Sequence, residues 1–283
     1  MGTKMVAGAL AACIAAACAE AKEPAFDTLI AHRGESVDAP ENTLPAYDTA
    51  VARGFGFECD VYLSADGRVF TFHDRDLSRT TAGACVKKCG EASWEKDISG
   101  LDVGSWGKWK GSKFAGTRPA LLEEVLERAV DGRYIYVEVK PGPSIVPYVK
   151  RVFEAQGKAT PANALFISFN ADTCRELKRQ MPEYKVYWLV SSRRRGEAGA
   201  EAPVTAEWIV GRLREIGADG VDCHYEPGVV TADLIGAVKK AGFEFHVWTI
   251  DDLDVALEAF RRGADTVTTN CAKKILDEYR ARR

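Results

Sequence analysis

From residue 28 onward, short runs rich in apolar and β-branched residues alternate with longer segments whose apolar positions recur at helical spacing. The short runs predict buried strands, and the longer segments predict amphipathic helices. The predicted strands are Leu29–Ala31, Phe57–Leu63 with its continuation Val69–Phe72, Tyr134–Val139, Ala164–Phe169, Lys185–Val190, Asp219–Cys223, Phe243–Thr249 and Asp265–Thr268. The predicted helices are Leu44–Ala52, Leu121–Ala129, Ile145–Gln156, Ala171–Arg179, Ala206–Ile216, Ala232–Ala241 and Asp252–Arg261. Alternation of this kind is typical of a parallel sheet with crossover helices.

The number of strand–helix units favours a closed barrel. Eight units over roughly 250 residues predict an α/β fold of the (β/α)8 TIM-barrel type rather than an open doubly wound sheet. No G-x-G-x-x-G motif opens a helix and no G-x-x-x-x-G-K-[ST] loop occurs, so a nucleotide-binding fold has no support. We predict that the barrel spans residues 27–280.

One long segment interrupts the alternation after the second strand. Residues 75–118 contain seven glycines and three tryptophans without clear periodicity. Because so long an irregular segment in a compact domain is usually functional, we predict a small insertion subdomain here. Cys85 and Cys89 lie within it and are a candidate disulfide in an exported protein.

The N-terminal residues have the composition of an export signal. Lys4 precedes an uncharged, alanine-rich run over residues 6–19, which is shorter than the ~18 apolar residues of a membrane-spanning helix. Ala19-Glu20-Ala21 fits a cleavage site, and Leu10-Ala11-Ala12-Cys13 resembles a bacterial lipobox. We predict a signal peptide or lipoprotein leader over residues 1–22. The protein would then be exported, whether periplasmic, secreted or held at the cell envelope by an N-terminal lipid anchor.

The charge balance argues against nucleic acid as a partner. The formal net charge is −3, and binding to a phosphate backbone needs clustered Lys and Arg. The run Arg193–Arg195 is short and is followed by Gly196-Glu197, so we interpret it as a solvated loop.

Polar side chains gather where the predicted strands end. The groups concerned are His32-Arg33, Glu58-Cys59-Asp60, His73-Asp74, Glu138-Val139-Lys140 and Trp248-Thr249. The carboxyl ends of parallel strands meet at the face where barrels of this type keep their active sites. We therefore expect one shared site at that face.

Three of these residues are candidate metal ligands. Glu58 and Asp60 are two positions apart in a strand and so share a face, and Glu138 can join them from the neighbouring strand. Three converging carboxylates repel one another unless a cation lies among them, and oxygen-only ligands select a hard divalent ion. We predict one divalent cation, Ca²⁺ or Mg²⁺, although any single pair of these residues could instead be a structural ion pair.

The histidines and cations suit phosphoryl transfer. Splitting a phosphodiester needs a proton removed from the nucleophile and a proton delivered to the leaving alcohol, and His32 and His73 can do both near neutral pH. Arg33 can hold phosphate oxygens in a bidentate grip, and Lys140 can add a point charge. The attacking group could be water or a neighbouring hydroxyl of the substrate.

The order of these motifs resembles that of the glycerophosphodiester phosphodiesterase (GDPD) family. The motifs are His32-Arg33-Gly34, Pro40-Glu41-Asn42-Thr43, Glu58-Cys59-Asp60, His73-Asp74, Glu138-Val139-Lys140 and Trp248-Thr249. The resemblance covers nearly all of residues 28–275, and Asp76–Thr81 and Leu101–Trp106 are similar to that family's own insertion. Each motif alone is weak, whereas their joint order and spacing is specific.

The resemblance implies hydrolysis of small glycerophosphodiesters to an alcohol and sn-glycerol 3-phosphate. It implies an acid–base pair (His32, His73), metal ligands (Glu58, Asp60, Glu138), phosphate-holding cations (Arg33, Lys140), an apolar wall against glycerol (Trp248) and a hydrogen-bonding neighbour of the site (Glu41). Independently of the resemblance, Asn42 or Thr43 could cap the helix that starts at Leu44.

The chain departs from the family pattern at the insertion. Arg118-Pro119-Ala120-Leu121 stands where the family usually has Ile-Pro-Thr-Leu, and the loop from Ala84 to Gly90 is unusual. Both departures leave the head-group preference open.

Two other functions compete with this one. A phospholipase of the phosphatidylinositol-phospholipase-C or sphingomyelinase-D type would need an exposed apolar rim, which Trp94, Trp106 and Trp109 could supply unless they form the core of the insertion. A non-catalytic phosphate-ester binding protein would have no need of an acid–base pair.

Overall fold

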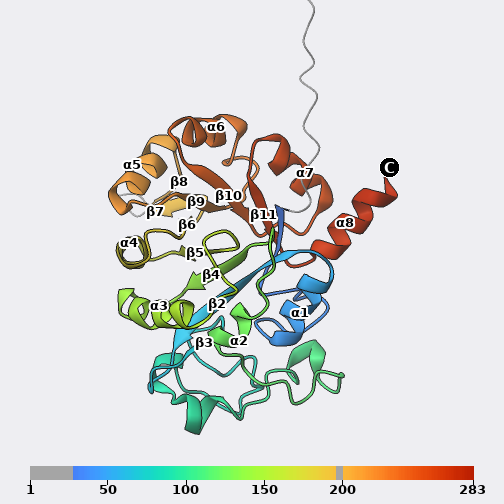
Figure 1. Ribbon diagram of the computed structural model, residues 1–283. Coiled ribbons are helices and arrows are strands. Elements are labelled where there is room, and N and C mark those ends of the chain that lie inside the picture. Colours follow the sequence, from blue (N-terminus) through green and yellow to red (C-terminus); the bar gives the residue numbers. More distant parts are fainter. Residues whose placement is uncertain (1–27, 196–199) are drawn as a thin grey trace, which may run out of the picture.

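The computed structural model describes residues 28–195 and 200–283, in which eight parallel strands close into a barrel (Figure 1). In spatial order the strands are β1 (Leu29–Ala31), β2 (Gly56–Leu63), β4 (Ile135–Val139), β5 (Ala164–Ser168), β6 (Val186–Val190), β9 (Gly220–His224), β10 (Glu244–Trp248) and β11 (Thr266–Thr269). The sheet closes because β1 pairs with β2 on one side and with β11 on the other. The predicted (β/α)8 TIM barrel is confirmed.

A helix follows each barrel strand and covers the outside of the sheet (Figure 1). The helices in the described residues are α1 (Leu44–Ala52), α2 (Leu122–Leu126), α3 (Val146–Ala155), α4 (Ala171–Gln180), α5 (Ala206–Ile216), α6 (Ala232–Lys240), α7 (Leu253–Arg261) and α8 (Ala272–Ala281). The sequence predicted all except α8, in which five of the ten residues are charged and only Ala272 and Ile275 are buried. Its apolar stripe is too narrow to recognise without the barrel against which it packs.

A layer of large side chains fills the barrel interior. Tyr136 and Tyr187 are buried there together with Leu165 and Ile167. Tyr187 has room because Gly220 faces it, and a Cβ at Gly220 would lie 2.8 Å from the tyrosine ring. The layer makes the barrel a packed core rather than a pore, and the polar residues lie above it at the carboxyl ends of the strands.

The second strand differs from the prediction. Residues Val69–Phe72 do not continue β2; they form the short strand β3 (Val69–Thr71), which runs antiparallel to β2. An Asp-Gly turn connects the two strands, and such a pair is a strong signal for a hairpin. The return brings the chain back to the barrel mouth, where the backbone N–H of Phe72 donates to the carbonyl of Asp60 at 3.0 Å. His73 therefore reaches the site from above, on a returning strand.

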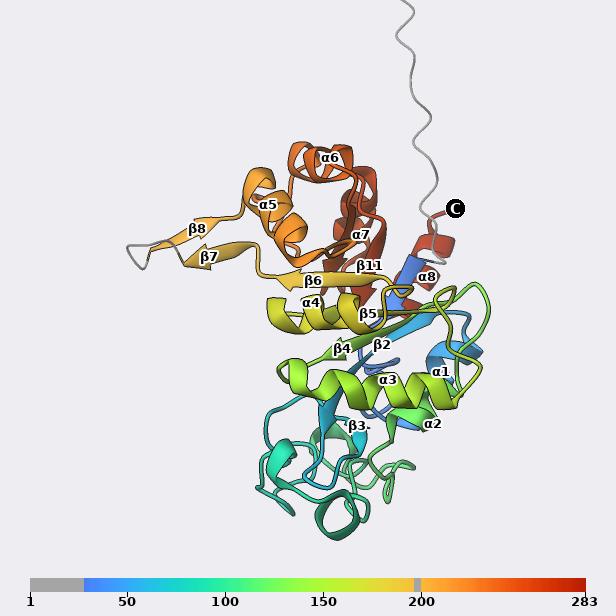
Figure 2. The ribbon, with the colours of Figure 1, turned by 60° about the vertical axis from the view of Figure 1, so that its left-hand side comes forward.

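The insertion, residues 75–118, lies to one side of the barrel beside β3 and α2 (Figures 1 and 2). It contains three short helical turns, η2 (Cys89–Glu91), η3 (Trp94–Ile98) and η4 (Gly107–Trp109). A separate small core joins it to β3 and consists of Phe70, Phe72, Leu77, Cys89, Ala92, Ile98 and Val103. The Cys85 and Cys89 thiols are not joined to each other in this structure.

The tryptophans of the insertion pack inward. Trp109 is 9% exposed and meets the ring of Phe114 edge-on at 5.3 Å. Trp94 lies 5.9 Å from the ring of Phe70 and packs against the small core of the insertion. Arg79 covers one face of Trp106 at 5.0 Å. The described residues of the insertion therefore form no exposed rim of aromatic side chains.

The arginine run is not a loop. Residues Arg193–Arg195 form strand β7, which pairs antiparallel with β8 (Glu201–Pro203) in a hairpin that projects from the barrel (Figure 2). Long-range contacts hold it, since Arg193 pairs with Glu226 and Arg194 lies over the ring of Trp208. A run of charged residues carries no alternation that would have revealed the strand.

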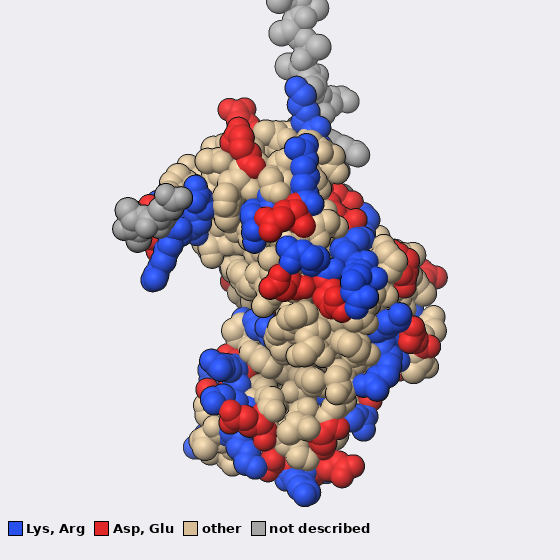
Figure 3. All heavy atoms as spheres, turned by 90° about the vertical axis from the view of Figure 1, so that its left-hand side faces the viewer, with Lys and Arg blue, Asp and Glu red and all other residues tan. Residues whose placement is uncertain are grey.

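The predicted leader, residues 1–22, lies outside the described residues and stays a prediction. None of the helices in the described ranges is both long enough and apolar enough to cross a membrane. On the face shown in Figure 3, acidic and basic side chains are interspersed over the barrel and the insertion.

We expect Gly34→Ala to lower the free energy of unfolding by about 2–4 kcal/mol, because it combines a left-handed backbone with an overpacked site. Gly34 has φ +77°, and a Cβ there would lie 2.6 Å from the backbone carbon of Ala46 in α1. Gly54→Ala is the matched control, because Gly54 has φ +82° with nothing within 4 Å of its Cβ position. That variant should lose only about 1 kcal/mol in urea denaturation. Equal losses would show that the close approach to α1 is unimportant.

Candidate active site

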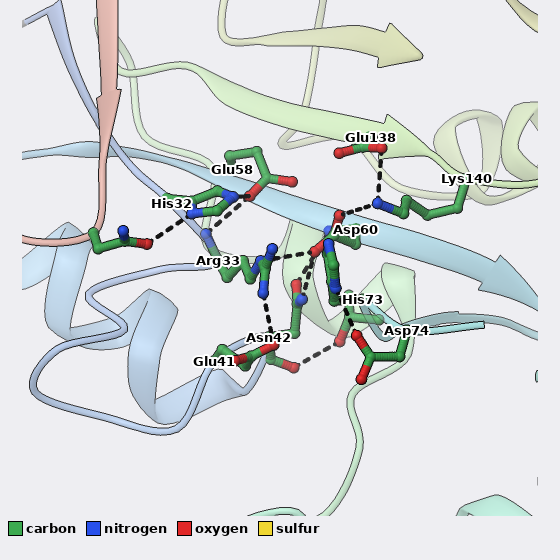
Figure 4. A network of polar contacts seen from close by, with 12 residues as sticks. His32, Arg33, Glu41, Asn42, Glu58, Asp60, His73, Asp74, Glu138 and Lys140 are labelled. Atoms are coloured by element: carbon green, nitrogen blue, oxygen red, sulfur yellow. Dashed lines mark hydrogen bonds and ion pairs between the residues drawn. The ribbon is translucent and has the colours of Figure 1, made fainter. Parts of the chain in front are cut away.

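A cavity of about 180 Å³ lies at the carboxyl ends of the barrel strands. The predicted site residues that line it are His32, Arg33, Glu58, His73, Glu138, Lys140 and Trp248. Asp60 is fully buried beside them, and Glu41 contacts Arg33 from outside the cavity. Figure 4 shows all of these side chains except Trp248 in one polar network. The structure thus brings together the residues that the sequence singled out.

The three predicted metal ligands, Glu58, Asp60 and Glu138, lie close together and form a carboxylate triad. Asp60 and Glu138 are paired positions of β2 and β4, and Glu58 points to the same side of β2. One oxygen from each carboxylate lies within 4.8 Å of the others. Lys140 bridges the group, with its Nζ 2.9 Å from Glu138 Oε1 and 3.2 Å from Asp60 Oδ1. All three carboxylates are buried, so water cannot screen their mutual repulsion.

Burial and neighbouring charges shift the pKa values of these three carboxylates in different directions. Burial and the charge of Asp60 raise the pKa of Glu58 and that of Glu138 above the usual range. Burial acts in the same direction on Asp60, but the charges of Lys140 and Arg33 outweigh it and lower the pKa of Asp60 to about 2. Glu58 Oε1 is buried without a hydrogen-bond partner. Such an oxygen, in a cluster short of positive charge, fits a divalent cation.

His32 is held in one tautomer by a chain of hydrogen bonds. Its Nδ1 lies 2.7 Å from Asn270 Oδ1, and the amide of Asn270 is fixed in turn because its Nδ2 donates to Asp251 at 2.7 Å. The oxygen of Asn270 can only accept, so the proton of the neutral ring is on Nδ1 and the lone pair is on Nε2. That Nε2 lies 3.9 Å from Glu58 Oε2. Burial and the charge of Arg33 lower the pKa of His32 to about 4.

His73 has a different partner. Its Nδ1 lies 2.7 Å from Asp74 Oδ1, and Arg79 binds the same carboxylate with its Nε and Nη2. Arg79 also donates to Glu41, so one guanidinium ties the His73 side of the cavity to the loop after β1. A carboxylate on Nδ1 fixes the orientation of the ring.

Arg33 links the buried carboxylates of the cavity to Glu41. Its backbone N–H donates to Glu58 Oε2 at 2.9 Å, its Nη1 donates to Glu41 Oε1 at 2.9 Å, and its Nε lies 3.4 Å from Asp60 Oδ2. The backbone has φ +56°, which a non-glycine residue rarely adopts. Glu41 therefore positions Arg33 and Arg79, in agreement with its predicted place beside the site.

Asn42 has a role that the sequence did not predict. It does not cap α1, nor does Thr43, whose hydroxyl donates to Pro40 O at 2.6 Å. Instead, Asn42 Nδ2 donates to Asp60 Oδ2 at 2.7 Å, and its Oδ1 accepts from the hydroxyl of Tyr47. The Pro-Glu-Asn-Thr motif contained the signal, but a polar residue before a helix also suits a cap, and only the fold distinguishes the two roles.

The rest of the cavity wall is mainly apolar. Ile167, Phe169, Leu189 and Trp248 form it, and Trp248 Nε1 donates to the backbone carbonyl of Asp222 at 3.0 Å. The side chain of Asp222 also lines this wall and is 1% exposed. Sequence reasoning missed this residue, although its alternation with Gly220 in β9 places it inside the barrel.

This site defines a class of protein: a barrel enzyme that acts on phosphate esters. Two histidines with opposite hydrogen-bonding environments, two cations and a candidate metal cluster surround one small cavity. Acid–base groups and positive charge around the same cavity are the elements that phosphodiester cleavage requires.

Comparison with known proteins agrees with this class. The model of the glycerophosphoryl diester phosphodiesterase family matches residues 32–274. A glycerophosphodiester phosphodiesterase of Caldanaerobacter subterraneus is 28% identical over 256 residues, covering 89% of this chain and 97% of the relative. A phosphodiesterase of Oleispira antarctica, solved with the product sn-glycerol-3-phosphate, has a TM-score of 0.75 at 28% identity, covering 89% of this chain and 96% of that one. The chain belongs to the glycerophosphoryl diester phosphodiesterase family, and the predicted enzyme class is confirmed.

We expect the binding of a divalent cation to release protons. Because the pKa values of Glu58 and Glu138 are raised, a cation must displace protons at neutral pH, and the apparent affinity should rise with pH. Calorimetry with Ca²⁺ or Mg²⁺ in buffers of different ionisation enthalpy measures this release. At 100 times the Kd, the cation should also stabilise the fold by about 2.7 kcal/mol.

Two variants control this measurement. Glu138→Gln should abolish both effects, whereas Asp254→Asn, on the exposed surface of α7, should change neither. Binding that persists in Glu138→Gln would place the cation elsewhere.

Proposed function

We propose that this protein is a metal-dependent phosphodiesterase that hydrolyses glycerophosphodiesters to an alcohol and sn-glycerol 3-phosphate. The observation that carries the proposal is the placement of His32 and His73 around one cavity with the carboxylate triad and two cations. The Oleispira antarctica relative was solved with sn-glycerol-3-phosphate, the product that this reaction would give. Family membership agrees with this substrate class.

The triad would hold the metal. Glu58, Asp60 and Glu138 offer oxygen ligands, and a hard divalent ion such as Ca²⁺ or Mg²⁺ prefers these. When bound, the ion supplies positive charge that stabilises the charge developing on the phosphate. Lys140 now pairs with two of these carboxylates and would turn to a phosphate oxygen once the ion neutralises them. Arg33 would bind a second oxygen from the other side.

His32 would act as the general base. Its lowered pKa keeps the ring neutral at physiological pH, and the hydrogen bond to Asn270 leaves the lone pair on Nε2. That nitrogen can accept a proton from water or from a glycerol hydroxyl next to the phosphate. The second route would give a cyclic phosphate first, and both routes use the same base.

His73 would act as the general acid. Asp74 accepts from Nδ1 and holds the ring, whose Nε2 can carry the proton that passes to the leaving alkoxide. Arg79 keeps the carboxylate of Asp74 in place.

The geometry gives less support to the competing functions. The predicted lipid-facing rim would need exposed tryptophans, whereas Trp94 and Trp109 pack into the insertion. A binding protein would not need a neutral histidine oriented on one side of a phosphate cavity and a carboxylate-paired histidine on the other. We therefore favour hydrolysis of a small soluble diester.

We expect His32→Ala and His73→Ala each to lower kcat/KM for glycerophosphocholine by about 10²- to 10⁴-fold, since each loses a proton-transfer group. The assay follows release of glycerol 3-phosphate from glycerophosphocholine, glycerophosphoethanolamine and glycerophosphoglycerol with Ca²⁺, Mg²⁺ or EDTA. His224→Ala, an exposed histidine outside the cavity lining, is the control and should keep its activity within about 3-fold. A folded wild-type protein that released no product from any diester would refute the proposed function.

A substrate with a better leaving group distinguishes the general acid from the general base. A nitrophenolate leaving group needs no protonation, so with the 4-nitrophenyl ester of glycerol 3-phosphate His73→Ala should lose little activity. His32→Ala should remain impaired by about 10²-fold or more, because the nucleophile still needs a base. Equal losses for both variants on this substrate would contradict the assignment of roles.

Asp74→Asn should lower kcat by about 10- to 10³-fold with little change in KM, because His73 loses the carboxylate that orients its ring. The loss should nearly disappear with the nitrophenyl ester. Asp76→Asn is the matched control, since Asp76 lies in the same loop and its carboxylate accepts hydrogen bonds from Ser78. A loss of equal size in Asp76→Asn would attribute the effect to the loop rather than to the histidine.

A further inference from the structure

Asp222 is a buried carboxyl group for which the proposed mechanism has no use. It lies on β9, faces the cavity and is 1% exposed. Its Oδ1 is buried without a hydrogen-bond partner, and among the described residues no Lys, Arg or His forms an ion pair with it. A buried carboxyl without partners costs stability and persists only where something else benefits.

The position of Asp222 separates it from the metal site. The three carboxylates that share a candidate ion do not include it. Its strand neighbours at the same level are Leu189 on β6 and His246 on β10, far around the barrel from the triad on β2 and β4. Asp222 therefore lies across the cavity from the cations that would bind phosphate.

We propose that Asp222 recognises the terminal hydroxyl of the substrate's glycerol group and so makes the enzyme selective for glycerol over other alcohols. This inference rests on the proposed function. It assigns the apolar wall to the glycerol carbons and the carboxyl of Asp222 to the hydroxyl farthest from the phosphate.

The chemistry of the wall selects a hydroxyl. Burial raises the pKa of Asp222 well above its usual range, and the charge of Glu138 adds to the effect. A hydroxyl both donates and accepts, so it matches a carboxyl in either protonation state, whereas a phosphate would be repelled by the ionised form. The surrounding Ile167, Leu189 and Trp248 are apolar and suit a short carbon chain.

Depth in the cavity places the glycerol end, rather than the head group, at Asp222. Phe169 marks the open side of the same wall, since it is 48% exposed and meets Trp248 edge-on at 5.6 Å. A variable head group fits the open side, while the part common to all the substrates fits the buried side. The central hydroxyl lies next to the phosphate and the triad, which leaves the terminal hydroxyl to reach across the cavity.

The test crosses two substrates with three proteins. The substrates are glycerophosphocholine and its propane-1,2-diol analogue, which lacks only the terminal hydroxyl and keeps the central one. The proteins are wild type, Asp222→Asn, which retains a hydrogen-bonding side chain, and Asp222→Leu, which removes the polar group. The readouts are kcat/KM, the thermal unfolding midpoint and the calorimetric affinity for sn-glycerol 3-phosphate.

We expect the wild type to prefer the glycerol substrate roughly 10- to 100-fold, the loss that follows when a buried hydrogen-bonding group is left unpaired. Asp222→Leu should lose a similar factor on the glycerol substrate and almost nothing on the analogue, and Asp222→Asn should retain most of the preference. The midpoint of Asp222→Leu should equal or exceed that of the wild type, because an unpaired buried carboxyl is gone.

Three results would overturn the inference. Equal losses on both substrates would show that the terminal hydroxyl is not recognised, and a lowered midpoint with a proportional loss of activity would make Asp222 structural. When glycerophosphoethanolamine and glycerophosphoglycerol are assayed as well, losses confined to the choline and ethanolamine diesters would assign Asp222 to a cationic head group. A wild type that hydrolyses neither substrate would refute the proposed function instead, and the affinity for sn-glycerol 3-phosphate would still show whether Asp222 contributes to binding.

Discussion

The mutual repulsion of three buried carboxylates is the constraint on which the rest of the site depends. Glu58, Asp60 and Glu138 meet at the barrel mouth because neighbouring parallel strands place them at the same level. Lys140 and Arg33 offset part of this charge, and the rest raises the pKa values of Glu58 and Glu138. In the protein alone the cluster lowers the stability of the fold. A bound cation and phosphate would offset this loss, so the features that destabilise the site also prepare it for a ligand.

The hydrogen bonds around this cluster make the two histidines different. Burial and the charge of Arg33 keep His32 neutral, and an amide on Nδ1 leaves its lone pair on Nε2, whereas the Nδ1 of His73 faces a carboxylate. The two partners arise differently, since Asn270 follows the last barrel strand and Asp74 is the residue next to His73. Closure of the barrel brings Asn270 to His32, whereas local sequence supplies the partner of His73.

The hairpin and the insertion extend this arrangement. β2 continues past the barrel rim, β3 returns, and His73 arrives level with Asp60 from above. The small core of the insertion packs on Phe70 and Phe72, the residues that precede His73. The insertion thus holds one candidate catalytic residue in position. Its tryptophans are packed, so the described residues form no exposed aromatic rim.

Residue order alone predicts the barrel and the inner set of site residues. Strand–helix alternation and the two-residue spacing of Glu58 and Asp60 depend only on local periodicity, which the chain carries in its residue order. The tertiary structure decided the antiparallel return of β3, the β7–β8 hairpin, and the roles of Asn42, Asn270 and Asp222. The two hairpins join residues close in the chain, whereas the roles of Asn42 and Asn270 depend on contacts between distant residues. A polar side chain in isolation looks the same whether it caps a helix, positions a catalytic group or faces a substrate.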